Sequence, residues 1–86
     1  MIYIDDECKK EMLFWEKSDK KVFKKILKLL NAIENNPFKW IGEPEPLKHE
    51  FAGLWSRRID QKNRLLYTIR EDGIWILACR GHYGDN

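Results

Sequence analysis

The sequence has no long apolar run and few cysteines. No segment approaches the roughly 18 to 20 consecutive apolar residues that cross a bilayer, and the opening MIYIDDECKK carries charges where a signal peptide needs an apolar stretch. We therefore expect a cytoplasmic protein without a membrane span. The two cysteines, Cys8 and Cys79, are far apart and lack CxxC spacing, which predicts neither a disulfide framework nor a four-ligand zinc site. We interpret both as small buried hydrophobic residues.

The chain also has little excess charge. Its 86 residues include 16 Lys or Arg and 14 Asp or Glu, for a formal net charge of +2. This balance excludes an arginine-rich, histone-like arm and a general nucleic-acid coat. The length admits one domain, over residues 1–86. Because so small a domain buries only about 60% of its unfolded surface, we expect it to bind a partner.

Arginine is absent from the first part of the chain. Residues 1–36 contain eight Lys and no Arg, whereas residues 37–86 contain all five Arg. Because the guanidinium group presents a fixed fork of donors that matches phosphate, we expect any phosphate chemistry in the second part.

Hydrophobic periodicity predicts a strand and then a helix at the start of the chain. Ile2 to Ile4 form a short apolar run, and Asp5 and Asp6 after it are good helix-starting residues. This helix should run to about Lys17. The residues that it should bury are Cys8, Met12, Leu13 and Trp15.

A second helix should begin after Asp19 and end at Asn36-Pro37. Its predicted apolar face comprises Phe23, Ile26, Leu27, Leu30 and Ile33. Its lysines, which lie mostly on another face, are Lys20, Lys21, Lys24, Lys25 and Lys28. They are compatible with a solvated face, or with an electrostatic surface for a long RNA or an acidic partner, and their spacing does not decide between the two.

The second part of the chain predicts an irregular loop and three strands. Residues 37–53 hold all three prolines, and Trp40, Leu47 and Phe51 should pin this loop to the core. The period then changes to two, which predicts strands at about 54–60, 64–70 and 74–82. The order β-α-α-β-β-β indicates an α+β fold, with a small, twisted, mainly antiparallel sheet and both helices on one face.

Residues 61–63 and 71–73 resemble three-residue hairpin loops, which sets a register for the sheet. With Asp60 opposite Arg64 and Arg70 opposite Ile74, the helices should cover one apolar face. This core face carries Trp55, Ile59, Leu65, Tyr67, Ile69, Trp75, Leu77 and Cys79, with Arg57 as a misfit. The open, basic face carries Ser56, Arg58, Asp60, Arg64, Leu66, Thr68, Arg70, Arg80 and His82, with Ile74, Ile76 and Ala78 toward one end. A two-residue turn at Asp72-Gly73 would instead move His82 to the core side.

The open face collects the residue types that RNA cleavage by its own 2′-hydroxyl needs. That reaction requires a base for the hydroxyl proton, cations for the charge on the phosphorane and an acid for the departing 5′-oxygen. The available residues are Glu45 in the proline-braced loop, Arg58 with Arg64, and His82. Histidine suits the acid role because it titrates near neutral pH, although the acid and base roles could be exchanged.

Some of these residues can also be interpreted without a functional site. Taken singly, Arg64 and His82 are typical of ordinary surface positions, and it is their convergence on one face that favours a site. By parity, Trp55 and Trp75 belong to the core rather than to a base-stacking platform. Since His49, His82 and the scattered carboxylates show no ligand spacing, we expect no metal or other cofactor.

Several motifs, taken in order, resemble one known family. They are Pro44-Glu45-Pro46-Leu47-Lys48-His49, Leu54-Trp55-Ser56-Arg57-Arg58-Ile59, Asn63-Arg64-Leu65-Leu66-Tyr67 and Ala78-Cys79-Arg80-Gly81-His82-Tyr83. With them, nearly the whole chain resembles the YoeB/Txe toxins, which are RelE-like toxins of type II toxin-antitoxin systems. The resemblance implies a toxin that enters the ribosomal A site and cuts messenger RNA. It also implies neutralisation by a YefM/Axe-type antitoxin, and homodimerisation is compatible with it.

The resemblance further implies roles for individual residues. The family's catalytic glutamate, arginine, histidine and tyrosine fall on Glu45, Arg64, His82 and Tyr83. Glu45 would be the base, Arg64 the stabilising cation and His82 the acid. The predicted RNA-binding residues are Lys48, His49, Arg57 and Arg58 from matching motifs, and Arg80 from the open basic face. The chain departs from the family pattern at Gly81, where a larger residue is expected, and in its tail at residues 84–86.

Two alternative functions differ from this one in what they do to messenger RNA. A non-catalytic RNA- or ribosome-binding module would keep the basic face and block translation without creating new message ends. An interaction protein would use the open face only to receive an antitoxin segment.

Overall fold

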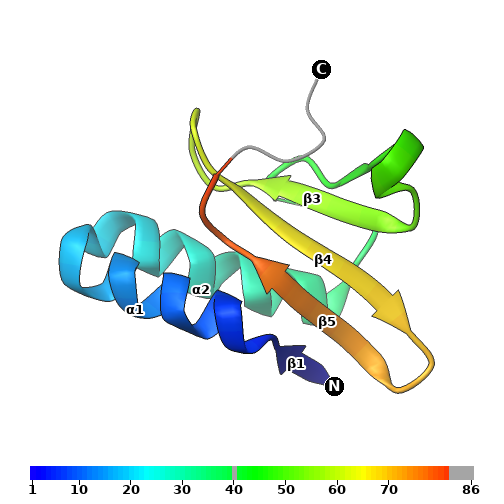
Figure 1. Ribbon diagram of the computed structural model, residues 1–86, viewed down its shortest axis with the longest axis horizontal. Coiled ribbons are helices and arrows are strands. Elements are labelled where there is room, and N and C mark those ends of the chain that lie inside the picture. The colour runs from blue at the N-terminus through cyan, green and yellow to red at the C-terminus, as the bar shows by residue number, and fades with distance from the viewer. Residues whose placement is uncertain (40, 82–86) are drawn as a thin grey trace.

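A computed structural model describes residues 1–39 and 41–81 of the 86-residue chain. Over these residues the elements are β1 (Ile2–Ile4), α1 (Asp6–Ser18), α2 (Lys20–Asn35), β2 (Glu45–Pro46), β3 (Leu54–Arg58), β4 (Arg64–Arg70) and β5 (Gly73–Ala78), with a short 3-10 helix at His49–Phe51 (Figure 1). The predicted α+β class is confirmed. The strand β2 lies inside the predicted irregular loop and was not expected.

The helices begin and end where the sequence indicates. Asp5 caps α1, and its carboxylate accepts a hydrogen bond from the backbone N–H of Glu7 over 3.2 Å. Asp19 caps α2 in the same way, by accepting from the N–H groups of Lys21 and Val22. A side chain that accepts from these otherwise unbonded amides stabilises a helix start by about 1 kcal/mol. Both helices are therefore specified locally.

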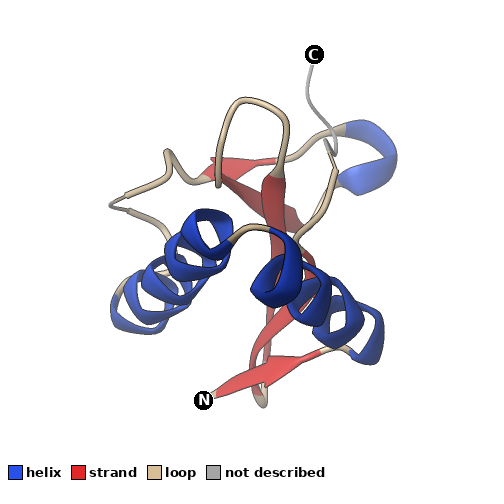
Figure 2. Ribbon diagram, turned by 90° about the vertical axis from the view of Figure 1, so that its left-hand side faces the viewer, coloured by secondary structure: helices blue, strands red, loops and turns tan. Residues whose placement is uncertain are grey.

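The sheet has the strand order β1-β5-β4-β3-β2. β1 is parallel to β5, and every other neighbouring pair is antiparallel. Figure 2 shows both helices on the same side of the sheet, as predicted. β2 is a two-residue edge strand that contains Pro46, and an edge is where a sheet tolerates proline, because no further strand needs its missing N–H.

The main core lies between the helices and this face of the sheet. Its buried residues are Cys8, Val22, Ile26, Leu29, Ile33, Ile59, Leu65, Tyr67, Ile74, Ile76 and Cys79. Two leucines predicted to be in the core are instead exposed, Leu13 by 55% and Leu27 by 45%. The buried stripe of α2 follows the narrower spacing 22, 26, 29 and 33, which leaves Leu27 beyond its edge.

The first hairpin, between β3 and β4, is two residues out of the predicted register. Arg58, rather than Asp60, lies opposite Arg64. Asp60 instead holds the connection, because its Oδ1 accepts from the backbone N–H groups of Lys62 and Asn63 over 2.8 and 2.7 Å. Since a shift of two residues preserves the side on which each side chain lies, the predicted faces of this hairpin are retained.

The second hairpin, between β4 and β5, departs further from the prediction. Arg70 pairs with Gly73 around a two-residue turn, which puts Ile74 and Ile76 in the core with Tyr67. A bulge then advances the register, so that Leu66 pairs with Ala78. Because the extra residue reverses parity, Cys79 returns to the core face.

Trp75 and Leu77 are consequently not in the main core, which corrects the prediction for both. The ring of Trp75 stacks on that of Tyr3 from β1, with 4.8 Å between the centroids. Leu77 packs on the other face of the sheet, against a small second core. Ile69, also predicted to be buried, is 38% exposed near the end of β4.

The second core partly covers the face that was predicted to be open. It consists of Leu47, Leu66 and Ala78, with Phe51, Leu54 and Leu77 packed against them. The chain between β2 and β3 therefore folds over the sheet. Leu47 and Phe51 attach it there by packing in this second core, as was predicted for both residues. Trp40, the third predicted anchor, lies outside the described residues. Within the described ranges, neither helix combines the length and apolarity needed to cross a membrane.

Candidate active site

The sheet register brings Glu45 and Arg64 to the same face, opposite the helices. Glu45 pairs with Ser56, and Arg58 pairs with Arg64. Directly paired residues share a face, and so do residues two apart on one strand. Glu45, Arg58 and Arg64 therefore project from one side of three neighbouring strands. The Nη1 atom of Arg64 lies 3.9 Å from Oε2 of Glu45.

The two members of this ion pair differ in their contact with water. The side chain of Arg64 is only 7% exposed, whereas that of Glu45 is 55% exposed. The guanidinium group is thus held within the protein surface, and the carboxylate stands at its rim. A cation with few surrounding waters acts more strongly on a nearby negative charge than a solvated one. This arrangement suits Arg64 to stabilising an anionic group that approaches beside Glu45.

The backbone of Arg64 is tied to the end of the described chain. Its N–H donates to the carbonyl oxygen of Gly81 over 2.8 Å. The Gly81 N–H in turn donates to Oδ1 of Asn63 over 3.0 Å. His82 and Tyr83, the other two predicted catalytic residues, lie outside the described residues, and their roles stay predictions. The structure does show that the residue before them is fastened beside Arg64.

Glu45 is positioned by the tightly folded segment before it. Gly42 has a φ of +84°, and its carbonyl oxygen accepts from the N–H of Arg58 over 2.6 Å. A Cβ atom at this position would lie 2.8 Å from a methyl carbon of Leu29. Glycine is therefore required here by both its backbone angle and its neighbours. Glu43, the next residue, contacts the guanidinium group of Arg58 at 3.5 Å.

Arg57 is the clearest departure from the predicted RNA-binding set. Its side chain is fully buried in the interior. Its guanidinium group donates to the carbonyl oxygens of Asn36, Lys39 and Ile41, and its Nε donates to the hydroxyl of Tyr67. These contacts anchor the segment that follows α2 to the core. We therefore assign Arg57 a structural role in place of the predicted contact with RNA.

The remaining predicted RNA-binding residues lie at three places. Arg58 is half-exposed beside Glu43. Lys48 and His49 are exposed at the start of the 3-10 helix, where His49 has a positive φ of 57°. Arg80 lies against α1, with its Cζ atom 3.7 Å from the centre of the Phe14 ring. Arg58 is thus the member of this set that shares the face and the neighbouring strands of Glu45 and Arg64.

Two residues beside the ion pair were not predicted as functional. Asn63 accepts from Gly81 and donates through Nδ2 to the carboxylate of Asp60, so it couples the hairpin loop to the end of the described chain. Ser56, opposite Glu45, is fully buried, and its hydroxyl has no hydrogen-bond partner among the described residues. The loop position of Asn63 was a usable signal. Ser56 lies on the predicted face, but its burial opposite Glu45 depends on the unpredicted strand β2.

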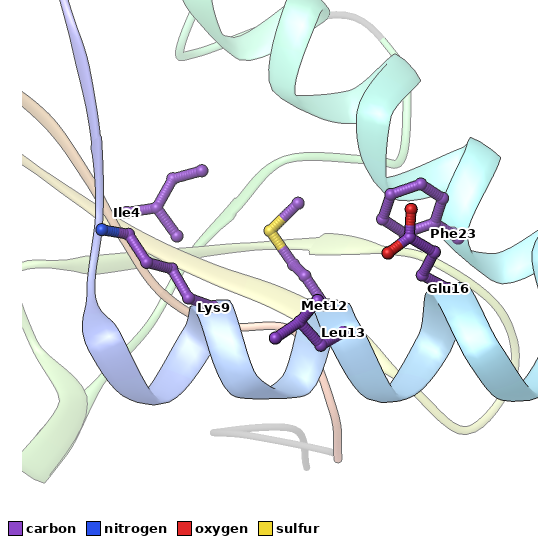
Figure 3. Close-up of a pocket in the computed structure, with 6 residues that line it drawn as sticks. All are labelled: Ile4, Lys9, Met12, Leu13, Glu16 and Phe23. Carbon is purple, nitrogen blue, oxygen red and sulfur yellow. The ribbon is translucent and has the colours of Figure 1, made fainter.

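A pocket of about 340 Å³ lies elsewhere on the molecule. Its lining comes from β1 and the two helices and consists of Ile4, Lys9, Met12, Leu13, Glu16 and Phe23 (Figure 3). It contains none of the residues predicted to act in catalysis or RNA binding. The candidate site is thus a surface formed by strand residues rather than this hollow.

The sequence and the fold can now be compared with those of known proteins. Residues 4–83 match the sequence model of the family described as the YoeB-like toxin of bacterial type II toxin-antitoxin system. Toxin YoeB of Escherichia coli K12 is 44% identical over 78 residues, which are 91% of this chain and 93% of that protein. The structure of a YoeB/ParE toxin from Agrobacterium tumefaciens superimposes with a TM-score of 0.90 at 33% identity, covering 95% of this chain and 98% of that one.

Two solved structures from Staphylococcus aureus are also similar. One is the heterotetrameric YoeB-YefM toxin-antitoxin complex, whose matching chain has 37% identity and a TM-score of 0.85, covering 96% of this chain and 97% of that one. The other is a YoeB dimer, with 37% identity, a TM-score of 0.86 and 95% coverage of both chains. The RelBE2 complex of Mycobacterium tuberculosis, at 19% identity and a TM-score of 0.72, shows that the fold is RelE-like.

These comparisons identify the class of protein as a toxin of a bacterial type II toxin-antitoxin system. Within that class, the chain belongs to the YoeB toxin family. The resemblance drawn from the sequence motifs is confirmed, as is the RelE-like α+β fold.

Proposed function

We propose that this toxin is a ribosome-dependent endoribonuclease that cleaves messenger RNA in the ribosomal A site. The observation that carries the proposal is the placement of the Glu45 carboxylate 3.9 Å from the guanidinium group of Arg64, on the sheet face away from the helices. A base and a cation at this separation can act on the two ends of one reacting unit, the 2′-hydroxyl and its adjacent phosphate.

In the proposed reaction, Glu45 takes the proton of the 2′-hydroxyl as its oxygen attacks the phosphorus atom. The exposure of Glu45 leaves its carboxylate accessible to RNA. Arg64 stabilises the negative charge that develops on the phosphorane oxygens, and His82 gives a proton to the departing 5′-oxygen. Tyr83 completes the predicted set. The family resemblance gives Glu45 the role of base and His82 the role of acid. Chemistry by itself would also allow the reverse.

The burial of Arg64 supports its assigned role. A guanidinium group already fixed by its surroundings needs little reorganisation as charge develops in the transition state. Its main-chain hydrogen bond to Gly81 also brings the start of β4 next to the segment that leads to His82. Lys48, His49, Arg58 and Arg80 would hold the message or ribosomal RNA, with Arg58 on the same face as Glu45 and Arg64.

The small net charge of +2 supports dependence on the ribosome. Affinity for free RNA comes largely from phosphate neutralisation, and this chain has little excess charge to supply it. The ribosome would instead bind and orient the message, which converts the reaction to one within a single complex.

We also propose a YefM-type antitoxin as the neutralising partner, because a similar toxin from S. aureus forms a YoeB-YefM complex. An acidic, amphipathic antitoxin segment would fold onto this domain and cover or distort the region of Glu45 and Arg64. Homodimerisation is proposed on the similarity to the S. aureus YoeB dimer.

The proposal is tested by mapping message 5′ ends on programmed ribosomes. Wild-type protein should create new ends within the A-site codon, and Glu45→Gln and Arg64→Ala should reduce their rate of appearance by at least about 100-fold. Arg70→Ala, an exposed arginine at the far end of β4, is the matched control and should cleave normally. Translation that stops without new ends would overturn the nuclease assignment in favour of a ribosome-binding inhibitor.

A further inference from the structure

Three potential metal ligands from distant parts of the chain converge beside α1. They are Cys8 and Glu11 of α1 and Cys79 just after β5. The two Sγ atoms and one carboxylate oxygen all lie within 4.8 Å of one another. Cys8 and Glu11 are three residues apart, a spacing that puts both on one side of the helix. The cluster shares no residue with the proposed catalytic set.

The main chain of Cys79 is fixed against α1 by side chains of that helix. Its N–H donates to Oε1 of Glu11 over 2.7 Å, and its carbonyl oxygen accepts from the indole N–H of Trp15 over 3.0 Å. The Cys79 thiol in turn donates to the carbonyl oxygen of Cys8 over 3.9 Å. The position from which the third ligand projects is therefore set before any ion binds. Such preorganisation lowers the cost of closing a site.

The spacing is close to that of a tetrahedral zinc site. Zn–S bonds of about 2.3 Å and Zn–O bonds of about 2.1 Å place tetrahedral ligand atoms about 3.6 to 3.8 Å apart. The three atoms here are separated by no more than 4.8 Å. Adjustments of about 1 Å, within reach of side-chain rotation, would therefore complete the triangle.

The composition of the cluster also distinguishes it from simple packing. Both thiols are fully buried, whereas Glu11 is partly exposed. The Glu11 carboxylate that accepts from the Cys79 N–H also brings an anionic oxygen next to both thiols. Thiolate sulfur and carboxylate oxygen are both ligands of Zn²⁺, and thiolate sulfur favours it over harder ions such as Mg²⁺ or Ca²⁺.

We propose that Cys8, Glu11 and Cys79 form a three-ligand site for a thiophilic divalent cation of the Zn²⁺ type. On binding, each thiol would lose its proton to solvent and form a metal–sulfur bond, the Glu11 carboxylate would supply the third bond, and water would take the fourth position. The ion would join α1 to the chain two residues before Gly81. It would stabilise the fold there, without a part in RNA cleavage.

The test uses the full chain, without a histidine tag and reduced by a phosphine, in equilibrium dialysis against Zn²⁺ followed by elemental analysis. The wild-type protein should bind one ion per chain. Titration with Cd²⁺ should produce thiolate-to-metal charge-transfer absorption, and either ion should raise the Tm. Cys8→Ser should weaken the affinity by at least about tenfold and diminish this absorption, because a ligand loss costs at least as much as the loss of an outer hydrogen-bond partner.

Glu11→Gln provides the second variant, since its amide oxygen can still accept from the Cys79 N–H while the anionic ligand is lost. It should fold with a Tm near that of the wild type in the absence of metal, and bind Zn²⁺ at least about tenfold more weakly. Glu7→Gln, an exposed glutamate one turn earlier on α1, is the control and should bind as the wild type does. Failure of the wild type to take up one ion, or uptake unchanged in Glu11→Gln, would overturn the proposal.

Discussion

The backbone N–H of Arg64 donates to the carbonyl oxygen of Gly81, so that the first residue of β4 holds the last residue that the structure describes. The side chain of the same arginine faces Glu45. One residue therefore connects a carboxylate on an edge strand with the chain segment that leads to His82. This double attachment explains how residues far apart in the sequence could serve one reaction.

The attachment of Gly81 predicts an effect of Asn63 on activity. Asn63→Ala removes the acceptor of the Gly81 N–H and, with it, the Asn63 hydrogen bonds to the Asp60 carboxylate within the loop, but no residue of the ion pair. One hydrogen bond contributes about 1 kcal/mol, so we expect message cleavage on programmed ribosomes to slow by about five- to tenfold. Gln61→Ala, an exposed change in the same loop, should cleave at the wild-type rate. Equal rates for the two variants would show that the Gly81 contact does not matter for cleavage.

Arg57 should contribute to stability rather than to RNA binding. Methionine in Arg57→Met fills a similar space. The variant lacks the guanidinium N–H groups that donate to three carbonyl oxygens and to the Tyr67 hydroxyl. Buried polar groups left unpaired cost about 1 to 3 kcal/mol each. Because some of them can turn to water, we expect a total loss of about 3 to 5 kcal/mol in the free energy of unfolding, measured with urea. Arg70→Met, at an exposed position where the guanidinium group lies over the Trp75 ring, should change it by no more than about 1 kcal/mol.

Gly42 and Gly53 allow the cost of a close contact to be separated from that of a backbone angle. Their φ values are +84° and +94°, but only an added Cβ at Gly42 would meet Leu29, at 2.8 Å. We expect Gly53→Ala to reduce stability by about 1 kcal/mol and Gly42→Ala by about 1 to 3 kcal/mol more, because the second also overpacks the core. Equal Tm values for the two alanine variants would contradict the packing argument.

Asp60 predicts a contribution to stability that depends on pH. Its partial burial raises the carboxyl pKa, but hydrogen bonds from the Lys62 backbone and from Asn63 outweigh this and hold the pKa below its usual value. A lowered pKa in the folded state stabilises the protein above the unfolded value, which is about 3.9, and this contribution is lost as the pH falls through the folded value. The difference in unfolding free energy between the wild type and Asp60→Asn should therefore be constant near neutral pH and shrink below about pH 4. Glu71→Gln, in the exposed turn, serves as the matched change of acid to amide, and the same dependence in both variants would rule out the loop hydrogen bonds as its cause.

Much of the fold follows from signals that act over a few residues. Asp5 and Asp19 cap the helices where expected, and Pro37 follows the end of α2. Period-two alternation located β3 and β4, with Arg64 at the start of β4. Glu45 was selected from the proline-braced loop instead, and the structure brings it to Arg64. These features could be predicted because each depends on local geometry or on the side to which alternate residues point.

The errors arise where a distant partner decides the outcome. The sequence Glu71-Asp72-Gly73 fits hairpin loops of two or three residues, and packing against β1 and the helices selects the shorter one. β2 has only two residues, so it shows no periodicity to detect. Arg57 was identified as a misfit on the core face, but its burial depends on carbonyl oxygens that the segment after α2 supplies.

The bulge opposite Leu66 and Tyr67 makes the face on which the residues at the end of β5 lie depend on the number of residues in that strand. Deleting Leu77 alone would invert the sides on which Ala78 and Cys79 emerge, whereas removing two neighbouring residues would restore them. Natural variation in length at this point should therefore occur in steps of two, because a single added or lost residue would move the buried Cys79 off the core face.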